Sequence, residues 1–418
     1  MASFSNFPED LKAQLNLPFR MLKTGNLHFG EEPKSFASKN WRFVYILPSS
    51  VLLITSTSYF AATSIDDLNA FAFSVGCATI GVMGLLSLMT LGNRKDDINF
   101  ILQEIAFFWP KDEYLSQKQI LAKKKHCDRL NNCAKLLIVM ALVGMWNFML
   151  QPLLVTASRR LVLRQRPRLT FPFPCYFPFD PTANWALYLA TYFYQCYSMT
   201  ILINLMIGTQ LFMVTILAQL SVLFTFLGDA LLGIRPTDNN IYNNNNNNIS
   251  VTEVTGDENE ESMLRQIRDI VKIHQRLILL SNILDNVFNK LICYIVIYAT
   301  ASICFFGFLT RAAPETKMKL FYGQAISSLL LMVHFICYYG QFLIDSSSNI
   351  AMAAYSNKWY KHGTHYQHNI RMIILRSQKP SSVTSLKYAP LTLNMCSTIL
   401  STSWSYCSLM YSFYYDKK

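Results

Sequence analysis

The chain has 418 residues, of which 52% are hydrophobic and only 15% are charged. Soluble globular domains carry about 25% charged residues, so this composition excludes an ordinary soluble domain and indicates a chain buried in lipid. The formal net charge of +12 does not indicate a nucleic-acid partner, because the excess Lys and Arg lie between apolar segments. Charges in that position set membrane topology.

The chain begins with a polar segment, residues 1–40, in which charged residues recur throughout. A cleavable signal peptide needs a continuous apolar stretch of about 7–15 residues, which this segment lacks. We therefore expect a cytosolic N-terminal tail over 1–40. The first apolar segment after it is expected to act as the insertion signal.

Seven charge-free runs follow, and each has the length of about 20 residues that an α-helix needs to cross a bilayer. We assign the first six spans to residues 41–343 and the seventh to 386–415. In chain order they are Phe43–Ile65, Leu68–Asn93, Leu136–Ser158, Pro181–Gly228, Leu291–Thr310, Leu320–Ile344 and Tyr388–Tyr415.

The fourth run is long enough for two spans, but its middle offers only Gly208 as a turn residue. A hairpin usually needs a cluster of Gly, Pro, Asn or Asp. We therefore predict one long helix over about 182–232. A disordered inner loop is expected over about 235–261, where Asn243–Asn248 precede the acidic stretch Asp257–Glu261.

The distribution of Lys and Arg gives the direction of the bundle. With the N-terminus in the cytosol, the inner segments hold 24 of the 37 cations and the outer segments hold 10. Splitting the fourth run into two spans would give 18 inside against 16 outside. Because cytosolic loops are enriched in Lys and Arg, we predict an all-α bundle of seven transmembrane helices. Its N-terminus is cytosolic and its C-terminus extracellular, which is inverted relative to G-protein-coupled receptors.

Two loops have compositions of their own. The second outer loop begins with an Arg cluster over 159–168, whose role the sequence does not reveal, and then alternates Pro with aromatic residues up to 181. Its aromatic rings could fold over the bundle as a lid or lie at the membrane interface. The inner segment 344–385 contains the apolar stripe Ile370, Ile373 and Ile374, which predicts a short cytosolic helix that ends before Pro380.

The sequence contains no motif of an enzyme, and no cofactor is expected. His362, His365 and His368 have helical spacing, but no Cys or carboxylate accompanies them, so a polar helix surface is favoured over a metal site. A transporter is disfavoured because the spans hold essentially no charged residue.

The last span is rich in Ser and Thr, which can line a hydrated path or serve helix packing. Leu409 and Phe413 follow near its outer end. From the residues alone, this pair is better interpreted as facing lipid than as a hydrophobic gate.

Several segments resemble the insect odorant receptor family. The run Ala353–Tyr360 is similar to the segment that follows the family's sixth span, and Arg376–Pro380 is similar to its basic turn before the last span. Leu391–Leu393, Ser403–Tyr406 and the start of the fourth run, Pro178–Pro181 with Trp185 and Tyr194-Gln195, add to the likeness. Cys396 in place of a customary Phe and the polyasparagine loop depart from it.

The resemblance implies a tuning subunit of a ligand-gated, nonselective cation channel, opened by a volatile odorant or pheromone. It further implies a heterotetramer with the co-receptor Orco, in the plasma membrane of the olfactory sensory neuron dendrite. The seventh span would line the pore, with Leu409, Ser412 and Phe413 at the gate. The implied pocket residues, in the outer half of the bundle, are Phe71, Ser74, Phe148, Tyr188, Tyr192, Phe321 and Gln324. The alternatives are a seven-span receptor that signals through a cytosolic partner and, less favoured, a transporter.

Overall fold

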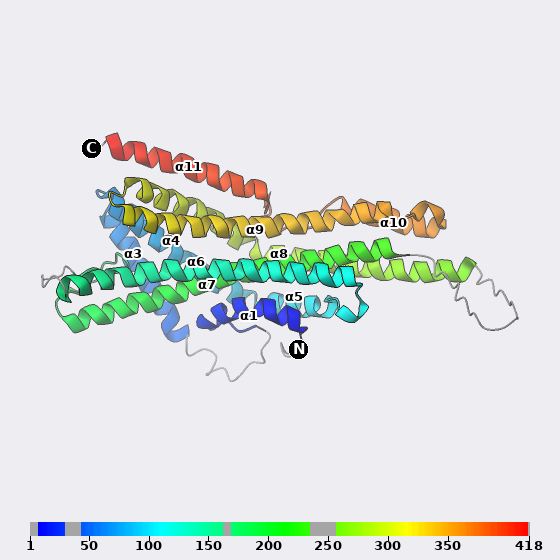
Figure 1. Ribbon diagram of the computed structural model, residues 1–418, viewed down its shortest axis with the longest axis horizontal. Helices are drawn as coiled ribbons and strands as arrows, with labels where there is room; N and C mark the ends of the chain where they lie inside the picture. The colour runs from blue at the N-terminus through cyan, green and yellow to red at the C-terminus, as the bar shows by residue number, and fades with distance from the viewer. Residues whose placement is uncertain (1–6, 30–42, 162–168, 235–255, 417–418) are drawn as a thin grey trace.

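The computed structural model describes residues 7–29, 43–161, 169–234 and 256–416. The polyasparagine run, most of the loop expected at 235–261 and the arginines at 164, 166 and 168 lie outside these residues. Along the longest axis the four longest helices run side by side (Figure 1), and seven helices in the described residues have more than 20 residues. They are α3 (Phe43–Thr63), α4 (Leu68–Asn93), α6 (Gln117–Leu161), α7 (Trp185–Gly233), α8 (Gly256–Ala312), α9 (Thr316–Ser356) and α11 (Leu393–Asp416).

Six of these helices, α3, α4 and α6–α9, are long and apolar enough to cross a membrane. The exception among the seven is α11, which has 24 residues and a length of about 36 Å at 1.5 Å per residue. Its length suffices for a span of about 30 Å. Its hydropathy is lowered by the Ser and Thr residues that occur along it.

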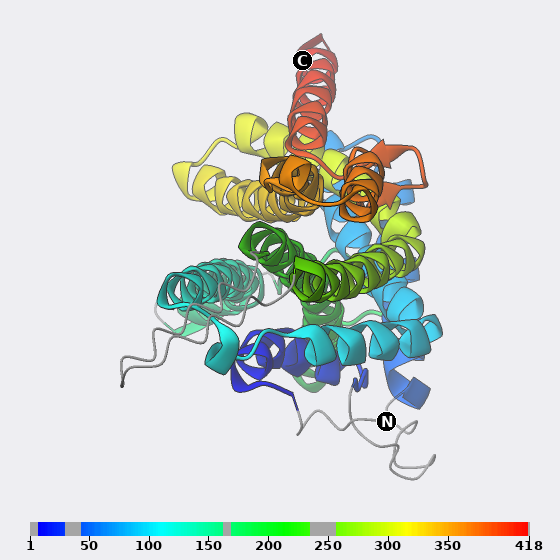
Figure 2. The ribbon, with the colours of Figure 1, turned by 90° about the vertical axis from the view of Figure 1, so that its right-hand side faces the viewer.

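The centre of the bundle is α7, a single unbroken helix of 49 residues. A helix that is apolar around its whole circumference is buried in protein or in lipid, and α7 contacts α1, α3, α4, α6, α8 and α9. In the end-on view, α7 and α8 occupy the middle of the molecule (Figure 2).

The long helices extend beyond their apolar parts. Helix α8 has 57 residues, about 85 Å at 1.5 Å per residue, which is far more than a bilayer requires. Together with α6, α7 and α9 it forms the end of the molecule that carries α10 (Thr364–Ser377), and the chain terminates at the opposite end (Figure 1). We refer to these as the α10 end and the C-terminal end.

Short elements pack beside the long helices. They are α1 (Glu9–Thr24), α5 (Lys95–Phe108), the 3-10 turns η2 (Asp112–Tyr114) and η3 (Trp359–Lys361), and a hairpin of β1 (Thr384–Ser385) and β2 (Ala389–Pro390). The two strands are antiparallel, with Thr384 opposite Pro390. In α10, Ile370 and Ile373 of the predicted stripe are buried and Ile374 is partly buried.

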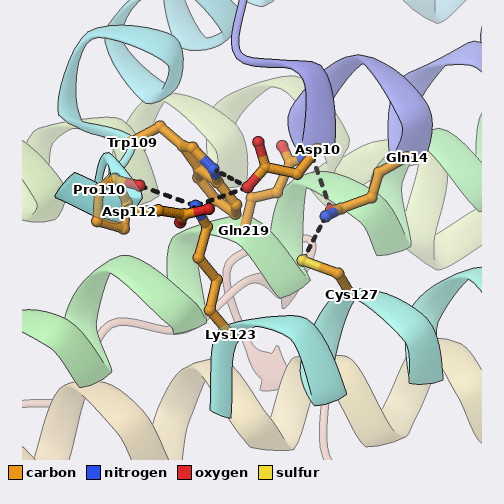
Figure 3. Close-up of polar contacts among 8 residues, drawn as sticks. All are labelled: Asp10, Gln14, Trp109, Pro110, Asp112, Lys123, Cys127 and Gln219. Carbon is orange, nitrogen blue, oxygen red and sulfur yellow. Dashed lines mark hydrogen bonds and ion pairs between the residues drawn. The ribbon is translucent and has the colours of Figure 1, made fainter. Parts of the chain in front are cut away.

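The N-terminal segment contains a helix that the sequence pattern did not reveal. Helix α1 buries Leu11, Leu15 and Leu22 on one face, which lies against α7. Its polar face is held by Lys123 of α6, whose side chain is 5% exposed. The Lys123 ammonium lies 2.6 Å from the Asp10 carboxylate and 2.8 Å from that of Asp112, and the Trp109 indole donates to Asp10 (Figure 3).

The α1 contact has an electrostatic signature outside the apolar spans. Burial of Asp10 opposes ionisation, but the hydrogen bonds and charge of Lys123 together with the Trp109 indole outweigh it, so the pKa of Asp10 is lowered below 3.8. Lys123 thereby joins α1, η2 and α6 in one ion-pair cluster.

Helix α11 packs on α8 and α9 through one face only and projects from the bundle in the end-on view (Figure 2). The buried face includes Cys396, Ile399, Ser403 and Cys407. At its base, a Cβ added to Gly340 of α9 would lie 2.4 Å from the Leu391 carbonyl oxygen, so this close approach requires glycine.

Candidate ligand cavity and pore helix

A cavity of about 130 Å³ lies inside the bundle, between α4, α6, α7, α8 and α9. Each helix contributes apolar side chains because the helices are apolar on the faces that meet there. The wall runs along α7 from Met199 to Gln210, about 16 Å at 1.5 Å per residue. No Asp, Glu, Lys or Arg lines it among the described residues, so the cavity suits an uncharged ligand.

Methionine dominates the cavity wall. Six of the 17 methionines of the chain line it: Met140, Met145, Met149, Met199, Met206 and Met332. The thioether side chain is unbranched and polarisable, so it fills irregular gaps and makes favourable contacts with aromatic rings. Such a wall can adapt to ligands of different shape. In the sequence, Met145 and Met149 are four residues apart and Met199 and Met206 are seven apart, so the members of each pair share a helix face.

The loop before α7 closes one end of the cavity. Phe173 is buried, lines the cavity and stacks on Phe148 of α6, with ring centroids 6.4 Å apart. Its backbone N–H donates to Gln195 Oε1 at 3.4 Å. Tyr176 and Phe179 of the same loop stay exposed. Phe173 therefore folds inward over the bundle, as expected of a lid, whereas Tyr176 and Phe179 do not.

Three of the seven residues expected in the pocket lie at or beside the cavity. Phe148 lines it, and the Phe321 ring packs on Phe148 with centroids 4.3 Å apart. Gln324 lies behind the wall, where it accepts a hydrogen bond from Asn147 at 2.8 Å and donates to the Met140 carbonyl at 3.2 Å. These bonds tie α9 to α6.

The other four expected residues lie elsewhere. Tyr188 donates to the Thr170 carbonyl at 2.9 Å, and Tyr192 donates to the Met149 carbonyl, so both hydroxyls hold backbone around the cavity. Ser74 is buried and donates to its own helix. Phe71 lines a separate groove between α3, α4 and α8.

Few polar side chains line the cavity. Ser328 donates to the Ala325 carbonyl within its own helix. Gln210 of α7 lines the cavity and is buried. Sequence analysis missed it because nothing in the apolar run distinguishes it from the two other glutamines there, Gln195 and Gln219.

The face of α11 that points away from α8 and α9 carries a polar stripe. Side chains at alternating spacings of three and four residues place a continuous row of oxygens along an exposed helix face. The stripe consists of Asn394, Ser397, Thr398, Ser401, Ser405, Ser408 and Ser412, all exposed in the single chain. Several of the hydroxyls donate to carbonyls of α11 itself, including those of Ser401 and Ser405. Their oxygen lone pairs remain available to groups outside the helix.

The residues expected at the gate lie beside this stripe. Ser412 belongs to it, whereas Leu409 and Phe413 are 52% and 62% exposed on the adjoining edge of the helix. The three side chains are therefore neighbours near the C-terminal end of α11.

The histidines at 362, 365 and 368 do not form a metal-binding group with each other or with other side chains in the described part of the chain. His362 packs on Tyr366 with ring centroids 4.8 Å apart, and His365 contacts the Asn369 amide. His365 and His368 are exposed on α10, and His362 lies just before this helix.

Comparison of the whole chain with solved structures shows the fold. The insect olfactory receptor OR5 from Machilis hrabei in complex with eugenol superposes with a TM-score of 0.78 at 14% identity, and the match covers 96% of this chain and 98% of that one. A second structure of OR5 gives a TM-score of 0.76. The expected all-α bundle of seven transmembrane helices is thus confirmed.

Sequence comparison shows the family. The signature of the 7tm Odorant receptor family matches residues 71–404. Putative odorant receptor 92a from Drosophila melanogaster is 23% identical over 367 residues, which are 87% of this chain and 82% of that protein. Odorant receptor 85b from the same species is 24% identical, with 81% of each chain covered. The chain therefore belongs to the family of seven-transmembrane odorant receptors.

Proposed function

We propose that the chain is a tuning subunit of a nonselective cation channel that a volatile odorant opens, with α11 lining the pore. The observation that carries the proposal is the exposed stripe of hydroxyl and amide oxygens along α11. In a membrane, an exposed polar stripe facing lipid would be costly. The stripe is satisfied when α11 helices of several subunits surround a water-filled path.

The chemistry of the stripe suits weak cation passage. Its hydroxyls are uncharged, and those of Ser397, Thr398 and Ser405 donate their protons to carbonyls of the same helix, which leaves oxygen lone pairs facing outward. Ions can be hydrated or briefly coordinated there without being trapped, which conduction requires. The expected gate residues, Leu409 and Phe413, would close the path by excluding water.

Ligand binding would act through the cavity. An odorant held between α4, α6, α7, α8 and α9 must bind the open arrangement more tightly than the closed one to shift the population. Helices α8 and α9 both line the cavity and both support α11, so a change in their packing reaches the pore helix directly. We assign ligand contact first to Phe148, with Phe321 and Gln324 shaping the wall behind it.

The proposal includes the partners and the direction in the membrane. The functional complex is a heterotetramer with Orco in the plasma membrane of olfactory neurons, with the N-terminus in the cytosol and the C-terminus outside. The excess of Lys and Arg in the inner segments supports this direction. Terminal epitope tags test it, because only a C-terminal tag should bind antibody on unpermeabilised cells.

The central experiment is coexpression with Orco and recording of odour-evoked current. Channel activity of the complex itself predicts a current that persists in an excised patch. A current that disappears on excision would instead identify a receptor that signals through a soluble partner. Silence of a surface-expressed complex across a broad panel that includes eugenol would contradict the proposal.

A further inference from the structure

Three buried glutamines lie on α7, and they differ in their hydrogen bonding. Gln195 accepts from the Phe173 backbone through Oε1, and Gln219 donates to Gln14 Oε1 at 3.4 Å, whereas Gln195 Nε2 and Gln219 Oε1 have no partner among the described residues. Gln210 is 2% exposed, and its side-chain amide has no hydrogen-bond partner in the part of the chain that the structure describes. It is also the only one of the three that lines the cavity.

An unpaired amide in an apolar enclosure is costly to maintain. Buried polar groups in proteins are nearly always paired, so an unpaired one indicates a missing partner. The amide can both donate and accept, and it can therefore satisfy a hydroxyl or a carbonyl. Since no charged side chain lines the cavity, carboxylate and ammonium ligands would lose their hydration without compensation.

The position of Gln210 gives the ligand a direction. Phe173 and Met199 lie at one end of the cavity, and Gln210 lies about 16 Å from Met199 along α7. The amide is thus at the end away from the loop, and the methionines line the space between. The volume of about 130 Å³ is close to that of an engineered apolar cavity of about 150 Å³ that holds benzene.

We propose that Gln210 is the polar anchor of the odorant cavity. The ligand is an uncharged molecule with one oxygen, an alcohol, aldehyde or ketone. Its apolar body has about the size of one aromatic ring, lies against the methionines, and points its oxygen away from Phe173. This inference rests on the proposed odorant-binding role of the cavity and adds the chemical class of the ligand and its orientation.

The test uses full-length receptor in complex with Orco, with binding and current measured on the same preparation in lipid nanodiscs and in membranes. The panel pairs each alcohol, aldehyde and ketone with a hydrocarbon of matched size and with the corresponding carboxylic acid and amine. Binders should be found among the oxygenated neutral members, with affinity at least about tenfold above the paired hydrocarbon. Equal affinity for hydrocarbons, preference for a charged member, or absence of binding by the whole panel would overturn the inference.

Substitution at Gln210 separates anchoring from folding. Gln210→Met keeps the length of the side chain and removes its hydrogen bonds, so the preference for the oxygenated ligand should fall at least about tenfold. Gln219→Met, outside the cavity, is the matched control and should retain the preference. If Gln210→Met does not reach the membrane, Gln210→Asn serves instead. Its shorter side chain should lower the affinity for a given ligand, and a homologous ligand with one more methylene should restore that affinity. If neither change in affinity is seen, Gln210 is not the anchor.

The two readouts keep this inference separate from the channel proposal. Selective binding that depends on Gln210 but evokes no current would contradict the proposed channel and leave the anchor intact. Odour-evoked current that does not depend on Gln210 would support the proposed channel and contradict the proposal that Gln210 anchors the ligand.

Discussion

The Lys387 ammonium lies 2.6 Å from the Asp285 carboxylate and so joins the segment before α11 to α8. The same carboxylate accepts hydrogen bonds from the Thr384 backbone N–H at 2.7 Å and its hydroxyl at 2.8 Å. Lys387 has a φ of 66°, a conformation uncommon for residues other than glycine, which the surrounding bonds hold in place. The hairpin that leads into α11 is therefore fixed to the middle of α8.

Removing the Asp285 carboxylate should release this hairpin. The Asp285 side chain is 11% exposed, and Asp285→Ala leaves Lys387 and Thr384 without their shared acceptor. We expect the free energy of unfolding to fall by about 3 kcal/mol, measured by chemical denaturation in detergent. Asp269→Ala, which breaks the exposed pair with Lys272, is the control and should cost less than about 1 kcal/mol. Similar losses in the two variants would show that the hairpin is held by other contacts.

The close approach of α9 to the base of α11 should be sensitive to a single methyl group. Gly340→Ala places a Cβ against the Leu391 backbone carbonyl, which no side-chain rotation can relieve. Such overpacking should lower the free energy of unfolding by about 1–3 kcal/mol and displace the base of α11. Gly323→Ala lies in the same helix with no atom within 4 Å of its added Cβ and should be neutral. The two variants are compared by their temperatures of thermal unfolding and by the size of their odour-evoked currents.

The fold was largely predictable from the sequence because its apolar runs are long and its charges fall between them. The start and end of α4 at Leu68 and Asn93 coincide with the boundaries of a charge-free run. By contrast, α1 was missed because its apolar face is short and depends on contact with α7. Tertiary contact, rather than local pattern, decides that helix.

The cavity was less predictable than the fold. Phe148 was placed in it, but Tyr188 and Tyr192 direct their hydroxyls to backbone carbonyls. Helical periodicity shows which residues face the bundle, but it does not distinguish those that fill it from those that border an empty space. Gln210 and the methionines could be assigned only after the five helices had been placed relative to one another.

The ion-pair cluster at Lys123 should hold α1 on the bundle. Asp10→Asn removes one of the two carboxylates on this buried ammonium, so we expect α1 to become more accessible to protease than in the wild type. The coupling between Asp10 and Lys123 is measured by a double-mutant cycle with Lys123→Met. Glu9→Gln, which alters an exposed pair with Lys12, serves as control. A coupling energy of zero would mean that the apolar face of α1 alone secures it.

The same cluster predicts a specific pH dependence. Because the pKa of Asp10 is lowered below 3.8 in the folded chain, its contribution to stability is fully present above that value and is lost as the pH falls through the lower, folded pKa. Protease protection of α1 should therefore be constant between about pH 5 and 8. Loss of protection near pH 6 would point to a histidine rather than to Asp10. Asp10→Asn should abolish the acid-dependent part of the stability.

Leu409 and Phe413, the apolar residues expected at the gate, should control the basal current. Leu409 borders the polar stripe of α11 and is half exposed. Leu409→Ala therefore removes apolar surface beside the stripe and leaves the buried face of α11 unchanged. If Leu409 excludes water from a closed pore, truncation should raise the basal current of the complex with Orco in the absence of odorant. The increase in basal current should be larger in the double variant, Leu409→Ala with Phe413→Ala, than in either single variant. Leu400→Ala, an exposed leucine away from the stripe on the same helix, is the matched control. Equal basal current in the wild type and the double variant, at equal surface expression, would place the gate elsewhere.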